Sequence, residues 1–99
     1  MRKETVYISG AISKNFHYFD DFKKVEQILR EKGFEKILTP TLLPDNLEYE
    51  QYMTVCFAMI DASDLVYMIP DWEQSHGATR EYYYALSKHK QFIMEELNL

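Results

Sequence analysis

Apolar residues recur along the chain with two different spacings, which together predict four strands and three helices. Short apolar runs predict strands at residues 5–9, 35–39, 65–69 and 91–95. Apolar side chains spaced three or four residues apart predict helices at residues 16–32, 47–62 and 77–89. Gly33 is placed to end the first helix, and Pro40 and Pro70 close the second and third strands. The predicted elements therefore alternate, beginning and ending with a strand.

This β-α-β-α-β-α-β order, with its short connections, defines the expected architecture. It predicts an α/β fold of three layers, Rossmann-like, in which helices cover both faces of a small parallel sheet of about four strands. A chain of 99 residues fits one domain, which we expect to span residues 1–99. Ligands of such sheets bind outside the carboxyl ends of the strands, where the strand order reverses. We therefore expect the polar loops 10–15 and 71–77 to meet there and line a pocket.

The loop after the third strand and the helix that follows it carry the strongest candidates for chemistry. Ser75, Gly77 and the first N–H groups of the helix could together hold an anion such as a phosphate. The alternative is an ordinary N-cap by Ser75, with Gly77 tolerated in the first turn. Glu81 lies about one turn further on, where the helix macrodipole favours the ionised form that a carboxylate nucleophile or base requires. Its alternative role is that of a favourable surface charge.

Other acidic and aromatic residues near this strand are weaker candidates. Trp72 is placed either to stack on a base or to cover the end of the sheet. Asp71 and Glu73 lie in the loop that meets the predicted pocket, and each is otherwise a surface acid. Asp64, at the start of the third strand, is better explained as a strand-edge or cap residue.

The turn after the first strand, with Ser9 and Gly10, resembles a loop that cradles a ligand, although a plain connection between strand and helix is the alternative. It lacks the full G-x-G-x-x-G of a dinucleotide site and the G-x-x-x-x-G-K-[ST] of a P-loop NTPase. The three histidines have no metal-ligand spacing with Cys56. We therefore expect neither a cofactor nor a metal ion.

Charge and composition narrow the class of partner. The net charge is −5 and the pI is near 5.1, which disfavours the broad Lys/Arg stripe that a nucleic-acid polymer needs. The lone Cys56 excludes an internal disulfide and fits a reducing compartment. The first residues lack a secretory apolar region, and no apolar run approaches the ~20 residues that span a bilayer. We expect a cytoplasmic protein without membrane contact and, because a small open sheet leaves exposed edges, a homo-oligomer, most simply a dimer.

Three segments of the chain carry a resemblance to a known group of proteins. The first strand ends Tyr7-Ile8-Ser9-Gly10, a buried strand starts at Asp64, and Trp72-Glu73-x-Ser75-x-Gly77-Ala78-x-x-Glu81-x-x-x-Ala85 follows. Together they resemble the nucleoside 2-deoxyribosyltransferase-like superfamily, in a branch of small bacterial and phage proteins. The resemblance implies a flavodoxin-like Rossmann fold and oligomers whose sites borrow residues from a neighbouring subunit. It also implies cleavage or transfer of the N-glycosidic bond of deoxynucleosides or their 5′-monophosphates.

The resemblance also assigns roles by position. Glu81 matches the family nucleophile, which attacks C1′ of the deoxyribose. The ligand-contacting positions of the family correspond to Ser9, Gly10, Ser75 and Gly77. Departure of a base builds oxocarbenium character at C1′, which a nearby carboxylate stabilises or traps covalently. The characterised enzymes carry an Asp on the helix before the third strand, and in this chain Cys56 or a neighbour stands there.

Two functions from different classes fit these residues. The first is N-glycosidic cleavage or deoxyribosyl transfer through Glu81, acting on a small-molecule nucleoside or nucleotide. The acceptor, water or a second base, and the need for a 5′-phosphate stay open. The second is a non-catalytic nucleotide-binding or assembly protein that keeps the pocket without its acid–base partner. The enzymatic function makes one geometric prediction: Glu81 must face a cleft that contains the Gly10 and Ser75 loops.

Overall fold

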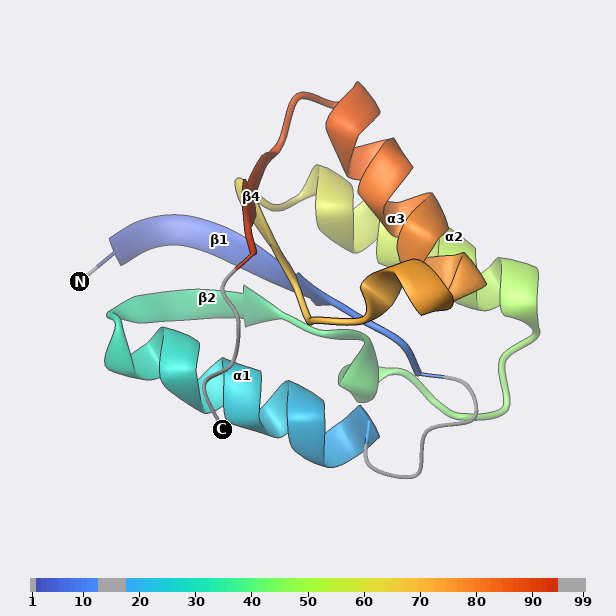
Figure 1. The fold of residues 1–99 in the computed structure, drawn as a ribbon, viewed down its shortest axis with the longest axis horizontal. Helices are drawn as coiled ribbons and strands as arrows, with labels where there is room; N and C mark the ends of the chain where they lie inside the picture. Colours follow the sequence, from blue (N-terminus) through green and yellow to red (C-terminus); the bar gives the residue numbers. More distant parts are fainter. Residues whose placement is uncertain (1, 13–17, 95–99) are drawn as a thin grey trace.

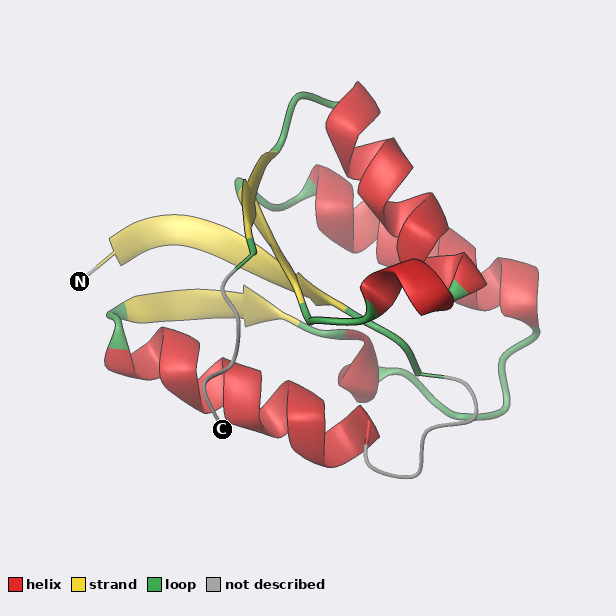
Figure 2. Ribbon diagram, in the orientation of Figure 1, coloured by secondary structure: helices red, strands yellow, loops and turns green. Residues whose placement is uncertain are grey.

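The computed structural model describes residues 2–12 and 18–94, which form alternating strands and helices (Figure 1). In chain order these are β1 (Arg2–Ser9), α1 (Tyr18–Glu31), β2 (Phe34–Leu38), α2 (Tyr49–Asp61), β3 (Leu65–Met68), α3 (His76–Ser87) and β4 (Gln91–Ile93). Two short 3-10 helices that the sequence pattern did not predict, η1 (Pro40–Leu42) and η2 (Trp72–Gln74), lie after β2 and β3 (Figure 2). The predicted order is confirmed. Residues 13–17 of the first loop and first helix, and residue 95, lie outside the described residues.

The strands form one parallel sheet in the order β2-β1-β3-β4, which confirms the α/β, Rossmann-like prediction. Val6 of β1 pairs with Ile37 on one side and with Leu65 on the other. The chain moves from β1 to β2 in one direction and then to β3 on the opposite side of β1, so the strand order reverses between β1 and β3. Parallel sheets of this kind bind ligands at that position. The backbone N–H of Ile69 donates to the carbonyl of Ser9 at 2.8 Å, which joins the ends of the two strands there.

Alternate residues of β1 face opposite layers, because successive side chains of a strand point to opposite faces of the sheet. Val6 and Ile8 pack in a core cluster with Phe22, Val25 and Leu29 of α1. Tyr7 belongs to the second cluster, with Cys56 of α2 and Ala85 of α3. Figure 1 shows α1 on one side of the sheet and α2 and α3 on the other. The polar Ser9, which shares the face of Tyr7, is thereby directed toward α2 and α3.

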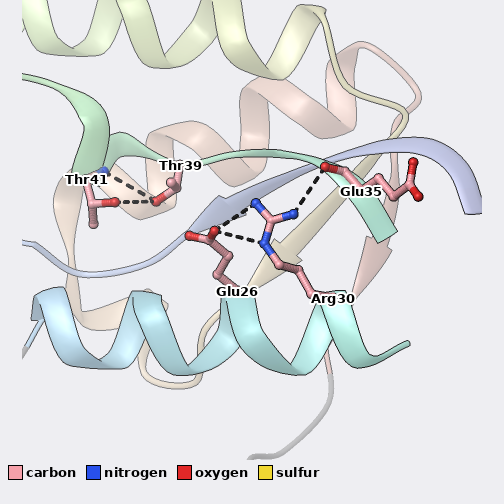
Figure 3. A network of polar contacts seen from close by, with 5 residues as sticks. All are labelled: Glu26, Arg30, Glu35, Thr39 and Thr41. Atoms are coloured by element: carbon pink, nitrogen blue, oxygen red, sulfur yellow. Dashed lines mark hydrogen bonds and ion pairs between the residues drawn. The ribbon is translucent and has the colours of Figure 1, made fainter. Parts of the chain in front are cut away.

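Polar contacts fix the two ends of β2 (Figure 3). Arg30, near the end of α1, bonds to the Glu26 carboxylate at 2.9 and 3.1 Å and to the Glu35 carbonyl of β2 at 3.4 Å. Gly33, with φ of 96°, makes the left-handed turn between α1 and β2 that a side chain would strain. After β2, the Thr39 hydroxyl accepts from the Thr41 N–H and caps η1. This cap fixes how the chain leaves the sheet at the start of the segment between β2 and α2.

Among the described residues, no helix is long and apolar enough to cross a bilayer. Asp64 has the strand-edge role expected of it, because its carboxylate accepts from the Thr5 N–H at 2.9 Å.

Candidate functional site

A cavity of about 400 Å³ opens at the carboxyl ends of β1 and β3. The end of β1 and the residues after it contribute Gly10, Ile12 and Tyr18, and α2 contributes Tyr49, Tyr52 and Met53. The segment between β2 and α2 contributes Pro40, Leu43, Pro44, Asp45 and Leu47. The first turns of α3 contribute Ser75, Gly77, Ala78 and Glu81. The structure therefore brings Glu81 together with the Gly10 and Ser75 loops around one hollow.

The carboxyl group of Glu81 is the buried polar centre of this cavity, with the residue only 3% exposed. Its Oε1 accepts hydrogen bonds from the Tyr7 hydroxyl at 2.9 Å and from Ser9 Oγ at 2.7 Å. Both donors come from the face of β1 that the strand's alternation directs toward α3. Because both bonds end on Oε1, Oε2 has no hydroxyl donor among the described residues. The surface-charge role that the sequence left open for Glu81 is excluded by its burial.

Burial raises the pKa of the Glu81 carboxyl from its ordinary value of 4.5 to about 7. The hydrogen bonds from Ser9 and Tyr7, and the nearby Cys56 thiol, oppose this shift only in part. The expectation that the start of α3 favours ionised Glu81 was therefore wrong in its net direction, because desolvation of the charge outweighs the helix macrodipole. Near neutral pH the protonated and ionised forms are both populated.

Cys56 lies beside this carboxyl on α2 and is fully buried. Burial, followed by the Glu81 charge, raises the pKa of its thiol to about 12. Burial also raises the pKa of Tyr52, on the same helix, well above its ordinary value. Both groups are thus neutral near pH 7, and neither supplies the second carboxylate that the resemblance leads one to look for at Cys56.

The start of α3 forms one wall of the cavity. Ser75 Oγ accepts from the Ala78 N–H at 3.2 Å and caps the helix, so the N-cap role is present. A Cβ added at Gly77 would meet Met53 and Tyr49 only at ordinary contact distances, so packing within the chain does not itself require glycine there. Both residues line the cavity, and the N–H groups of a helix start suit an anionic or polar ligand group.

Gly10 packs closely against Ile69, the residue after β3. A Cβ added at Gly10 would lie 3.0 Å from Ile69 Cβ, which is tighter than nine in ten real Cβ contacts. We expect Gly10→Ala to lower the free energy of unfolding by about 1–3 kcal/mol, because the end of β1 must move away from β3. Urea denaturation measures the loss, and Gly77→Ala, where a Cβ has room, is the matched control. Equal stability of the Gly10 variant and the wild type would contradict the prediction.

The structure does not bring Asp71 and Trp72 to the cavity wall. Asp71 is exposed and holds a left-handed backbone, with φ of 72°, at the turn before η2. The Trp72 ring stacks on Tyr82 at 4.6 Å and packs on the α2/α3 side of the core. These contacts correspond to the sheet-covering role considered for Trp72. We carry neither residue into the proposed site.

The sequence did not identify Tyr7, the α2 residues Tyr49 and Tyr52, or the segment between β2 and α2 as parts of the site. Tyr7 could have been predicted, because the alternation of β1 places its side chain on the same face as Ser9. The pattern predicts only a connecting loop between β2 and α2. Its apolar residues Leu43 and Leu47 are the signal that this segment packs against the rest of the chain. Tyr52 sits in a helical pattern that predicts only burial.

The fold and the site together define the class: a small parallel α/β domain with a buried carboxylate at the ligand-binding edge of its sheet. The chain belongs to the family described as Domain of unknown function (DUF4406), whose model matches residues 4–94. A comparison with curated proteins found no match.

A solved structure with a similar fold is that of the 2-desoxiribosyltransferase from Leishmania mexicana. The TM-score is 0.68 and the sequence identity is 21% over 91% of this chain. The chain spans 62% of the length of that protein. The similarity confirms the deoxyribosyltransferase-like, Rossmann-like fold that the sequence motifs indicated.

Proposed function

We propose that this protein cleaves or transfers the N-glycosidic bond of a nucleoside or nucleotide, with Glu81 as the nucleophile. The observation that carries the proposal is the Glu81 carboxylate itself, buried at a cavity of about 400 Å³ and held through Oε1 by Tyr7 and Ser9. Cavities of a few hundred Å³ are the size of ordinary small-molecule sites. The similarity of fold to a 2-desoxiribosyltransferase supports the same chemistry.

In the proposed reaction, ionised Glu81 attacks C1′ of the deoxyribose through Oε2. A C–O bond forms at C1′ as the C–N bond breaks, and the base leaves with the electron pair and takes up a proton. Water or a second base then attacks C1′, and the carboxylate is released. Tyr7 and Ser9 fix the carboxylate so that it reaches C1′ without reorganising, which is how a preorganised polar group lowers a barrier.

The test is release of free base from 2′-deoxynucleosides and from their 5′-monophosphates, followed by chromatography. Wild-type protein is expected to release base from at least one of them, and Glu81→Ala to release none above background. Glu73→Ala is the matched control, because Glu73 is an exposed acid of η2 outside the cavity lining. Equal release by wild type and Glu81→Ala would remove the proposal.

A second function is favoured by one observation, the presence of Cys56 beside Glu81. Its thiol has a pKa of about 12 and offers neither a base nor a charged partner at neutral pH. The presence of Cys56 is compatible with a protein that binds nucleotides in this cavity without cleaving them. Stabilisation of the wild type by deoxynucleosides in a thermal shift assay, with no free base after long incubation, would favour this function over the first.

We also propose that the protein acts as a cytoplasmic homodimer. Val55 of α2 and Tyr83 and Leu86 of α3 are apolar side chains 37–62% exposed on the described chain. The sheet ends in β2 and β4, neither of which has a further strand beside it among the described residues. Sedimentation at micromolar concentration is expected to give a species of about twice the 11.9 kDa chain mass. A single species at the chain mass would contradict the dimer.

A further inference from the structure

A cluster of four side chains joins the start of α2 to the first two turns of α3 beside the cavity: Tyr49, Glu50, His76 and Arg80. Arg80 makes two contacts with the Glu50 carboxylate, at 3.0 and 3.4 Å. The Arg80 guanidinium also lies 5.5 Å from the centre of the Tyr49 ring. His76 stacks on Tyr49 with ring centres 6.2 Å apart and planes inclined by 27°. His76 and Arg80, which lie one turn apart on α3, therefore both contact the Tyr49 ring.

Tyr49 is nonetheless 46% exposed and forms part of the cavity wall. From the segment between β2 and α2, the apolar Leu43, Pro44 and Leu47 lie on that wall, together with the acidic Asp45. A large aromatic ring that is held in place and still exposed loses little conformational entropy when it meets a ligand, so its contact area contributes to binding. Glu81 and the start of α3, which supply polar groups to the cavity, lie on a different element. The start of α3 thus supplies polar groups suited to a sugar, whereas α2 and the segment before it supply mainly aromatic and apolar side chains suited to a planar ring.

We infer that Tyr49 is the side chain that packs against the nucleobase of the ligand, and that Arg80 is a positioning residue that holds it there. The inference rests on the proposed nucleoside site and assigns its base-binding side, which the sequence motifs did not identify. Arg80 acts through its contacts with Glu50 and with the Tyr49 ring. Tyr49 acts through the face and edge of its ring, and its hydroxyl is not required.

Calorimetric titration with 2′-deoxyadenosine and with free adenine tests the role of Tyr49. Tyr49→Ala is expected to weaken the binding of both probes about tenfold, the usual size of an aromatic–base contact. Tyr49→Phe, which keeps the ring, is expected to bind within about twofold of wild type. The matched control is Phe19→Ala, because Phe19 is 42% exposed on α1 and lies outside the cavity lining. Because the readout is binding, it is independent of whether base is ever released.

The positioning role of Arg80 has its own signature. Arg80→Ala is expected to weaken 2′-deoxyadenosine binding about threefold, and Arg80→Lys to recover part of that loss. If base release occurs, Arg80→Ala should raise KM with kcat and the pH profile unchanged. Arg30→Ala is the control, since Arg30 makes the same kind of ion pair with Glu26 on α1, away from the site (Figure 3).

Three results would overturn the inference. In the first, Tyr49→Ala binds 2′-deoxyadenosine as tightly as Phe19→Ala does. In the second, the wild type binds neither probe. In the third, Arg80→Ala binds like Arg30→Ala, which removes the positioning role of Arg80. Absence of base release together with normal binding by the wild type would instead reject the proposed reaction and leave the assignment of Tyr49 standing.

Discussion

Replacing Glu81 by Gln is expected to lower base release from the preferred substrate by on the order of 10³-fold or more, because an amide cannot form the bond to C1′. The amide oxygen can still accept from the Tyr7 and Ser9 hydroxyls, which both end on Oε1 in the wild type. The geometry of the cavity is thus kept while the nucleophile is lost. Chromatography of the reaction products measures the change.

The activity of the wild type should also depend on pH in one direction. In the proposed reaction only ionised Glu81 attacks, and burial raises the pKa of this group to about 7. Base release is therefore expected to rise as the pH increases from 5 and to level off above about 8. Glu73→Gln, which alters an exposed acid outside the cavity, should reproduce the wild-type profile. A rate that is flat or falling across this range would contradict the role of Glu81 as an ionised nucleophile.

The second large effect expected is on stability, and its sign follows from the same pKa. The unfolded chain loses the Glu81 proton near pH 4.5, whereas the folded protein keeps it until about pH 7. Below pH 4.5 both states are protonated, so the group's contribution to stability is fully present. As the pH rises from 4.5 through 7, that contribution is lost, because the folded state must then bury an ionised carboxylate. The raised pKa of Glu81 corresponds to about 3 kcal/mol.

The measurement compares wild type with Glu81→Gln in urea denaturation at pH 4 and pH 8. The free energy of unfolding of the variant, relative to the wild type, should increase by about 3 kcal/mol between these pH values. The other carboxylates titrate alike in both proteins and cancel in this difference. A difference that stays constant with pH would mean that the pKa of Glu81 is the same in the folded and the unfolded protein.

Much of the fold could be predicted from the sequence because the periodicity of apolar residues reports directly on burial. The continuous run that becomes β3 and the three-and-four spacing of α1 each identified their element to within a few residues. Element ends were less accurate. The third helix begins at His76 because Ser75 caps it, one residue before the predicted start at Gly77. The short helices η1 and η2 are too brief to leave a periodic signal.

The candidate site could be predicted only in part, since motifs report neighbours in sequence and not those in space. Gly10 and Ser75 are predicted because they follow strand ends that must share one edge of the sheet. Glu81 is predicted from its place about one turn into the helix and from the resemblance. The burial of Glu81 was not visible in its helix, and the direction of its pKa shift was therefore misjudged. Trp72 lies beside Ser75 in sequence, but its ring packs on Tyr82 and does not line the cavity.

The alternation of β1 ties the chemistry of this protein to its architecture. The strand buries Val6 and Ile8 against α1 and presents Tyr7 and Ser9 to Glu81. Deleting a single residue early in β1 would exchange these two sets, since strand periodicity is two. Aliphatic side chains would then surround Glu81, and the hydroxyls of Tyr7 and Ser9 would enter the apolar core beneath α1. Mutations along β1 should therefore affect folding and the proposed reaction together.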